Sequence, residues 1–227
     1  MHPVGLRKAM KRTLLLLSLF AGLSAFGQEA RGDMPADVFY LLPEFRQGMV
    51  YFSDQGPAQG NLNICAAAQT LRFMDKDQEL SSKAANINRV VVDDIVFVRV
   101  DGAYYRLYPI TDDLTLACRR DVEILRDVKT GAYGMQSRTS SIREVGSLQS
   151  DGMMYTLQSS KSYPYNVSES FFLFQAGDVT PINKRSLRKR FPARKDELDA
   201  WLKSHSLPKT LEDTRAFLSR LNDGEEL

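Results

Sequence analysis

The chain has 227 residues, of which 43% are hydrophobic, and this length is sufficient for one substantial hydrophobic core. Its formal charge of +2 comes from 30 basic and 28 acidic side chains, but four of the basic ones lie in the first 27 residues. Without that segment, 26 basic side chains face 28 acidic ones, a charge of −2. Overall charge therefore gives no support for a nucleic-acid partner.

Residues 1–27 have the pattern of a signal peptide. Four basic side chains between positions 7 and 12 precede an apolar stretch, Thr13–Ala25, which is too short to span a bilayer as a stable helix. Ala25 and Gly27 put small residues at the −3 and −1 positions, so we expect cleavage before Gln28. Translation starts at Met1 or at Met10, and both starts leave a sufficient basic region. No later stretch approaches 18 consecutive apolar residues, so we expect an exported protein that is not transmembrane after cleavage. We expect it in the periplasm or peripheral to the outer membrane.

Residues 28–47 form a polar linker followed by a short apolar segment. Val38–Leu42 stops at Pro43, which excludes helical geometry for Leu42. The segment fits either a short helix or an initial strand.

Residues 48–182 are predicted to form a mainly β domain: an antiparallel multi-strand sheet, a sandwich or a barrel-like arrangement. Short runs rich in β-branched and aromatic residues alternate with turn signals, of which Asp101-Gly102 is the strongest hairpin signal. The runs are Gly48–Phe52, Asn61–Ile64, Thr70–Met74, Arg89–Val92, Ile95–Val100, Ala103–Tyr108, Leu114–Cys118, Val122–Ile124, Met153–Leu157, Phe171–Phe174 and Val179–Ile182.

Residues 183–227 change to helical periodicity and are predicted to form two to three short amphipathic helices. Asn183 and Thr210 are suitable N-caps, and Gly224 is a suitable C-cap. The apolar stripes, with Trp201 on one helix and Phe217 on another, are too narrow for helices buried on all sides. We expect them to dock on the β domain. The alternative is that they are reserved for a partner.

Cys65 and Cys118 are the two cysteines, and an exported chain permits a disulfide between them. Strand parity argues against it, because Cys118 shares a face with Leu116, whereas Cys65 shares one with Asn63. Unless a bulge intervenes, one side chain points inward and the other outward. A buried Cys118 thiol is the alternative.

These strand and tail motifs resemble a family of uncharacterised exported proteins of Bacteroidota. The shared residues are Gly48-x-Val50-x-Phe52, Leu62-Asn63, Leu71-x-Phe73, Val90-x-Val92, Phe97, Tyr104-Tyr105, Leu116, Gly131–Gly134, Ser137–Ser141 and the tail Asn183–Pro192. The resemblance covers most of residues 38–222. Ile64-Cys65 departs from it, because similar chains often have an aromatic residue there. The resemblance implies export and a β-rich architecture, and it implies no catalytic residues.

No catalytic, cofactor-binding or metal-binding constellation stands out. His205 is the only histidine after residue 27, and it lies at the exposed end of a predicted helix, which leaves no nucleophile–histidine pair. We therefore favour a binding or scaffolding role in the cell envelope over catalysis. The alternative is a hydrolase that acts on envelope polymers or glycans through carboxylates on the sheet, such as Asp93-Asp94 and Asp112-Asp113.

Two groups of side chains are candidates for binding. Seven cations within twelve residues could contact an anionic envelope component or another envelope protein: Lys184, Arg185, Arg188, Lys189, Arg190, Arg194 and Lys195. The alternative for this basic run is a solvated helix face with local pairs to Asp196 and Glu197. Four tyrosines could stack on a sugar or a peptide: Tyr104, Tyr108, Tyr163 and Tyr165.

Overall fold

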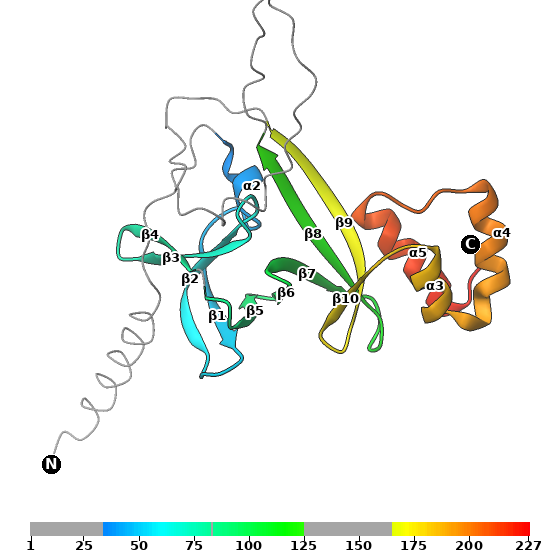
Figure 1. The fold of residues 1–227 in the computed structure, drawn as a ribbon, viewed down its shortest axis with the longest axis horizontal. Helices are drawn as coiled ribbons and strands as arrows, with labels where there is room; N and C mark the ends of the chain where they lie inside the picture. The colour runs from blue at the N-terminus through cyan, green and yellow to red at the C-terminus, as the bar shows by residue number, and fades with distance from the viewer. Residues whose placement is uncertain (1–33, 83, 125–164) are drawn as a thin grey trace, which may run out of the picture. The chain divides into compact units, whose positions relative to one another are not determined.

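The computed structural model describes residues 34–82, 84–124 and 165–227 (Figure 1). The predicted signal peptide, the expected strand at Met153–Leu157 and Tyr163 lie outside the described residues. No helix in the described ranges is long and apolar enough to cross a membrane.

The described residues form ten strands and five helical segments, which confirms a mainly β protein with C-terminal helices. The strands are β1 (Arg46–Phe52), β2 (Ala58–Cys65), β3 (Thr70–Asp75), β4 (Gln78–Ser82), β5 (Ile87–Val92), β6 (Ile95–Val100), β7 (Ala103–Pro109), β8 (Thr115–Ile124), β9 (Tyr165–Gln175) and β10 (Asp178–Pro181). The helices are α2 (Ala36–Phe39), α3 (Lys184–Arg190), the 3-10 helix η2 (Pro192–Arg194), α4 (Lys195–Ser204) and α5 (Leu211–Asp223). The strand order in the antiparallel sheet is β10-β9-β8-β7-β6-β5-β1-β2-β3-β4.

The tight turns lie at the positions predicted from the sequence. Asp101 and Gly102 both take positive φ (50° and 81°), as Asp-Gly hairpin turns require, and β6 pairs with β7 across them. Asp93 takes φ 53° in the turn between β5 and β6. Strand β4 was not predicted, because Gln78–Ser82 is largely polar. It ends the strand order, where polar edge strands are common.

The described chain divides into two compact units. The first takes the described residues up to Asp94 and those between Asp121 and Val167. The second takes Ile95–Arg120 and Ser168–Leu227. The C-terminal helices therefore share a unit with β6, β7 and β10.

One face of the first unit's strands carries an apolar core. Val50, Leu62 and Val90 are fully buried, and Val50 lies opposite Val90 in the β1–β5 register. Gly48 lies in the same core, at a close approach between β1 and β5. A Cβ atom at Gly48 would lie 2.6 Å from the carbonyl oxygen of Val91, so this position requires glycine.

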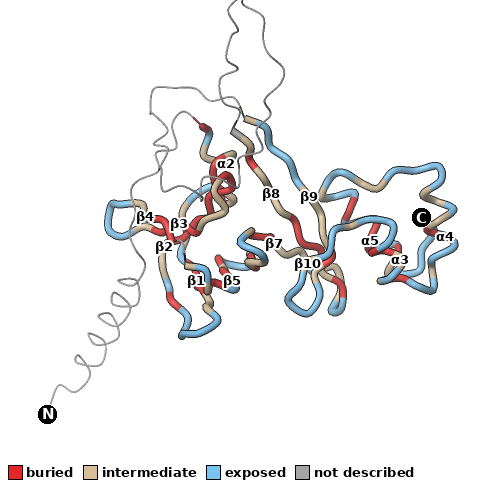
Figure 2. The backbone as a smooth tube through the Cα atoms, viewed as in Figure 1, coloured by how far each residue is buried: buried red, intermediate tan, exposed pale blue. Residues whose placement is uncertain are grey.

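On β2, β3 and β4, the opposite face carries polar residues that are also buried. Asn63, Arg72 and Ser81 lie in register across β2, β3 and β4 and are 0%, 1% and 6% exposed. The segment around α2 covers this side, with Phe39 and Tyr40 packed against Cys65, Ala66 and Ala67. Figure 2 shows buried residues at α2. The apolar segment Val38–Leu42 therefore begins at the end of a short helix and continues into an extended stretch, where Tyr40 bridges Cys65.

In the second unit, the helices pack on one face of the strands. Leu116 of β8 and Leu173 of β9 form a single cluster with Leu187, Leu198 and Phe217 from the three α-helices. The predicted caps are present. Asn183 and Thr210 accept hydrogen bonds at the helix starts, and Gly224 ends α5 in the left-handed conformation. The apolar stripes are thus docked within the chain, as expected.

Candidate functional site: the basic face of the C-terminal helices

The basic run begins in α3, and local capping explains why this short helix forms. The side-chain oxygen of Asn183 accepts hydrogen bonds from the backbone N–H groups of Arg185 (2.9 Å) and Ser186 (3.0 Å). The Ser186 hydroxyl in turn accepts from the Asn183 N–H (3.0 Å), which completes a capping box. Leu187 is buried in the core and holds the helix there, so the basic side chains of α3 lie toward the protein surface.

Two of the seven cations share a carboxylate on the neighbouring helix. Arg188 donates to Asp199 through Nε (2.7 Å) and through Nη2, and Lys184 Nζ lies 3.2 Å from Asp199 Oδ1. The hydrogen bond from Arg188 is the main reason why the pKa of Asp199 is lowered, and the same bond raises the pKa of Arg188. This contact clamps α3 to α4.

A third cation ties the end of α3 to the turn before β8. Arg190 Nη2 lies 2.7 Å from Asp113 Oδ2 and 3.0 Å from the Asp113 carbonyl oxygen. Hydrogen bonds from Arg190 and then from Thr111 lower the pKa of Asp113. The Arg190 side chain therefore forms an intramolecular ion pair.

A fourth cation, Arg194, binds the C-terminal end of α5. Its Nη1 donates to the carbonyl oxygens of Arg220 (2.6 Å) and Leu221 (3.1 Å), its Nη2 donates to that of Glu225, and its Nε donates to Glu197 (2.8 Å). Carbonyl groups at a helix C-terminus carry negative partial charge, so a guanidinium is well placed there. The Arg194 side chain is only 14% exposed.

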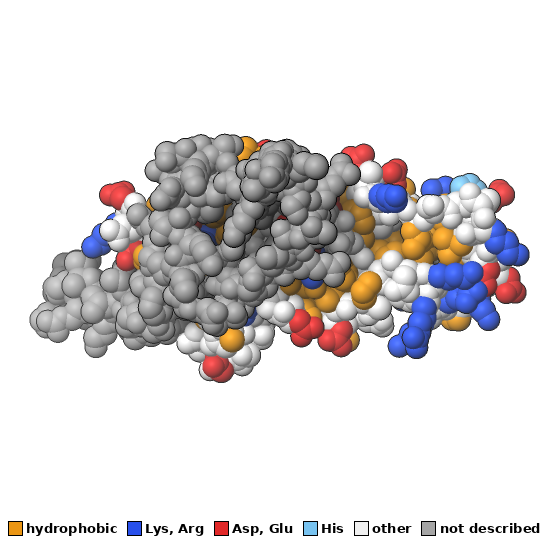
Figure 3. All heavy atoms as spheres, turned by 45° about the horizontal axis from the view of Figure 1, so that its top comes forward, with side chains coloured by type: hydrophobic (Ala, Val, Ile, Leu, Met, Phe, Trp, Pro, Cys, Tyr) orange, Lys and Arg blue, Asp and Glu red, His pale blue; other side chains and the backbone are white. Residues whose placement is uncertain are grey.

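The other three cations face solvent. Arg185, Lys189 and Lys195 are exposed, and no hydrogen bond or ion pair holds their side chains within the described residues. We call these three residues the exposed triad. Figure 3 shows Lys and Arg side chains gathered over the helices. The basic run therefore contains both structural cations and cations available for binding, a division that the sequence did not show.

The three candidate tyrosines that the structure describes have different surroundings. Tyr104 is 1% exposed and burial raises its pKa, which corrects the expectation that its ring is open to a ligand. Tyr108 is half-buried, with the guanidinium carbons of Arg106 and Arg215 at 4.9 and 5.8 Å from its ring centroid. Burial raises the pKa of Tyr108 as well. Tyr165 packs against the cluster around Phe39 in the first unit.

Cys65 and Cys118 are both buried thiols, and no disulfide joins them. The expectation that one of them points outward is wrong for Cys65, which is 1% exposed. The reason is that the segment around α2 covers the polar side of β2, so both faces of this strand are buried where Cys65 lies.

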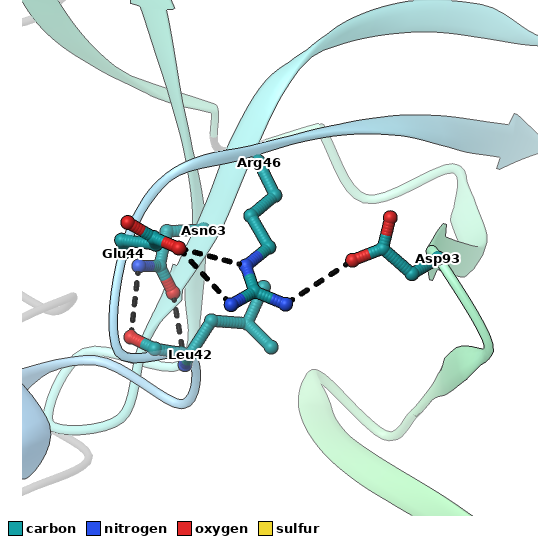
Figure 4. A network of polar contacts seen from close by, with 5 residues as sticks. All are labelled: Leu42, Glu44, Arg46, Asn63 and Asp93. Carbon is teal, nitrogen blue, oxygen red and sulfur yellow. Dashed lines mark hydrogen bonds and ion pairs between the residues drawn. The ribbon is translucent and has the colours of Figure 1, made fainter.

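The carboxylate pairs lie in turns, and one member of each pair binds an arginine. Asp93 accepts from Arg46 (3.2 Å), which also binds Glu44 (3.0 Å), as Figure 4 shows. Asp113 is held by Arg190, as described above. Among the described residues, no group of three or more His, Cys, Asp or Glu side chains could hold a metal ion.

Sequence reasoning missed a buried polar cluster under the segment around α2. The Tyr40 hydroxyl donates to Glu79 Oε2 (2.7 Å), and Arg72 Nη1 lies 3.7 Å from Glu79 Oε1. Burial, and next the hydrogen bond to Glu79, raise the pKa of Tyr40. The available signal was the apolar segment Val38–Leu42, which needed a surface to cover.

Asn63 is the second missed residue. Its side-chain oxygen accepts from the Leu42 N–H (3.1 Å), and its amide nitrogen donates to the Leu42 carbonyl oxygen (3.1 Å; Figure 4). The side-chain amide of Asn63 thereby pairs with both backbone polar groups of Leu42, just before β1, in place of a neighbouring strand. Its role is structural.

No protein-family model, curated protein or solved structure matches the chain.

Proposed function

We propose that the protein is an exported binding or scaffolding protein of the cell envelope, which contacts an anionic envelope component through the exposed triad. The observation that carries this proposal is the division of the basic run. Four cations bind carboxylates or helix-end carbonyls, whereas Arg185, Lys189 and Lys195 are exposed without such partners in the described part of the chain.

The scaffold supports a recognition role because it fixes the triad in place. Arg185 and Lys189 lie four residues apart on α3, which the capping box, Leu187 and the clamp to Asp199 hold. Lys195 begins α4, the helix that carries Asp199. Charges on fixed helices retain a defined spacing, which favours association with a charged partner.

A pull-down from envelope extract tests the proposal. The mature chain is the bait, and the variant Arg185→Gln/Lys189→Gln/Lys195→Gln removes the triad. A matched control, Lys76→Gln/Lys203→Gln/Lys209→Gln, removes three exposed positive charges elsewhere. We expect an anionic component, lipid or protein, to co-purify with the wild type and with the control, and to be lost from the triad variant. Equal recovery with the triad variant would refute the proposed function.

A further inference from the structure

The shape of the basic face indicates the kind of partner. Arg185 and Lys189 project from α3, and Lys195 lies at the start of α4, all on exposed positions. The open depression on α5 includes none of these three. Its lining residues are Ile110, Glu212, Arg215, Ala216 and Ser219. The exposed triad therefore lies outside that depression, on the open surface of α3 and the start of α4, where an extended anionic partner has access to it.

The face also lacks the features of a protein–protein interface. Such interfaces are centred on apolar or aromatic anchors and are depleted in lysine. Among the described residues, Val167 on β9 is the one exposed large hydrophobic side chain, and the large apolar side chains of the helices are buried or partly buried. The Trp201 ring packs against neighbours in its own unit, with its centroid 5.0 Å from that of Phe217 and 4.7 Å from that of His205.

The chemistry of the exposed cations points the same way. The arginines whose planar groups bind carboxylates through two nitrogens, Arg188 and Arg194, are already occupied by Asp199 and Glu197. The negative charges of Asp199 and Glu197 are therefore balanced by these two arginines. Two of the three remaining cations are lysines, which act as hydrated point charges rather than as forks for one carboxylate. Point charges without an apolar anchor suit attraction to many headgroup phosphates.

We infer that the exposed triad attaches the protein peripherally to a membrane surface that carries anionic phospholipid headgroups. This inference rests on the proposed function and names the partner of the same face. One cation near such a surface contributes about fivefold to binding, so removing three should weaken it roughly 100-fold. Because the charges stay outside the bilayer, attachment should be reversed by salt.

Vesicle co-sedimentation of the mature chain tests the inference. The vesicles contain phosphatidylcholine alone or phosphatidylcholine mixed with phosphatidylglycerol. The proteins are the wild type, the triad variant and the matched control described above. Circular dichroism confirms that each protein is folded.

We expect the wild type to bind only the vesicles with phosphatidylglycerol and to be released as salt is raised. The triad variant should bind roughly 100-fold more weakly and the matched control should bind nearly as well as the wild type. Equal binding to both kinds of vesicle, or an equal loss in the control, would overturn the inference. If the wild type binds no vesicle but captures an acidic protein from envelope extract through the triad, the membrane inference fails and the proposed function stands. If the triad also makes no difference in the extract, both fail.

Discussion

Replacing Arg194 tests whether part of the basic run is structural. The side chain is 14% exposed and donates to the carbonyl oxygens of Arg220 and Leu221 at 2.6 and 3.1 Å. A hydrogen bond with a charged partner contributes about 1.5–3 kcal/mol, and the partly exposed ion pair with Glu197 adds little after screening by solvent. Two shared carbonyl contacts at a helix end are not fully additive. We therefore expect Arg194→Ala to lower the free energy of unfolding by about 2–3 kcal/mol.

Urea unfolding monitored by tryptophan fluorescence gives the measurement. Trp201 is the only tryptophan of the chain and packs against Phe217 of α5, so its signal reports on the helices that Arg194 joins. Arg185→Ala is the matched control, because Arg185 is exposed. It should change stability by less than about 0.5 kcal/mol. Equal effects of the two substitutions would refute the division of the basic run into structural and exposed cations.

Three further predictions concern other contacts. Asn63→Ala leaves the N–H and C=O of Leu42 without their partner, so urea midpoints should show a loss of about 2–4 kcal/mol, and a loss below about 1 kcal/mol would contradict this account. Gly48→Ala places a Cβ atom 2.6 Å from the carbonyl oxygen of Val91, and the melting temperature should fall by an amount equivalent to more than about 1 kcal/mol, whereas an unchanged melting temperature would disprove the close approach. The pKa of Asp199 is lowered in the folded state, so its stabilisation is present above the ordinary carboxylate pKa of about 4 and is lost as the pH falls through the lowered value. Urea midpoints measured across acid pH should therefore decline less steeply for Asp199→Asn than for the wild type, and identical pH profiles would exclude a contribution from this pair.

Local chemistry explains which parts of the fold were predictable. Asp101-Gly102 and the alternating run in β6 specify a hairpin from adjacent residues alone, because the turn needs positive φ and the strands need one apolar face. Asn183 caps α3 through atoms only two and three residues away. Strand β4 was not predictable in this way. Gln78–Ser82 carries no apolar pattern and forms a strand only by pairing with β3.

The sequence alone determined the strand and helix periodicity, the turns and the density of the basic run, because each depends on residues close together in the chain. Only the tertiary structure decided which cations are available. Asp113 lies 77 residues from Arg190, and the helix end that Arg194 binds lies 26 residues beyond it. It also decided that the polar side of β2 is buried, since Tyr40 and Leu42 reach Glu79 and Asn63 across the fold. Side-chain partners distant in sequence are fixed by packing, and no local pattern encodes them.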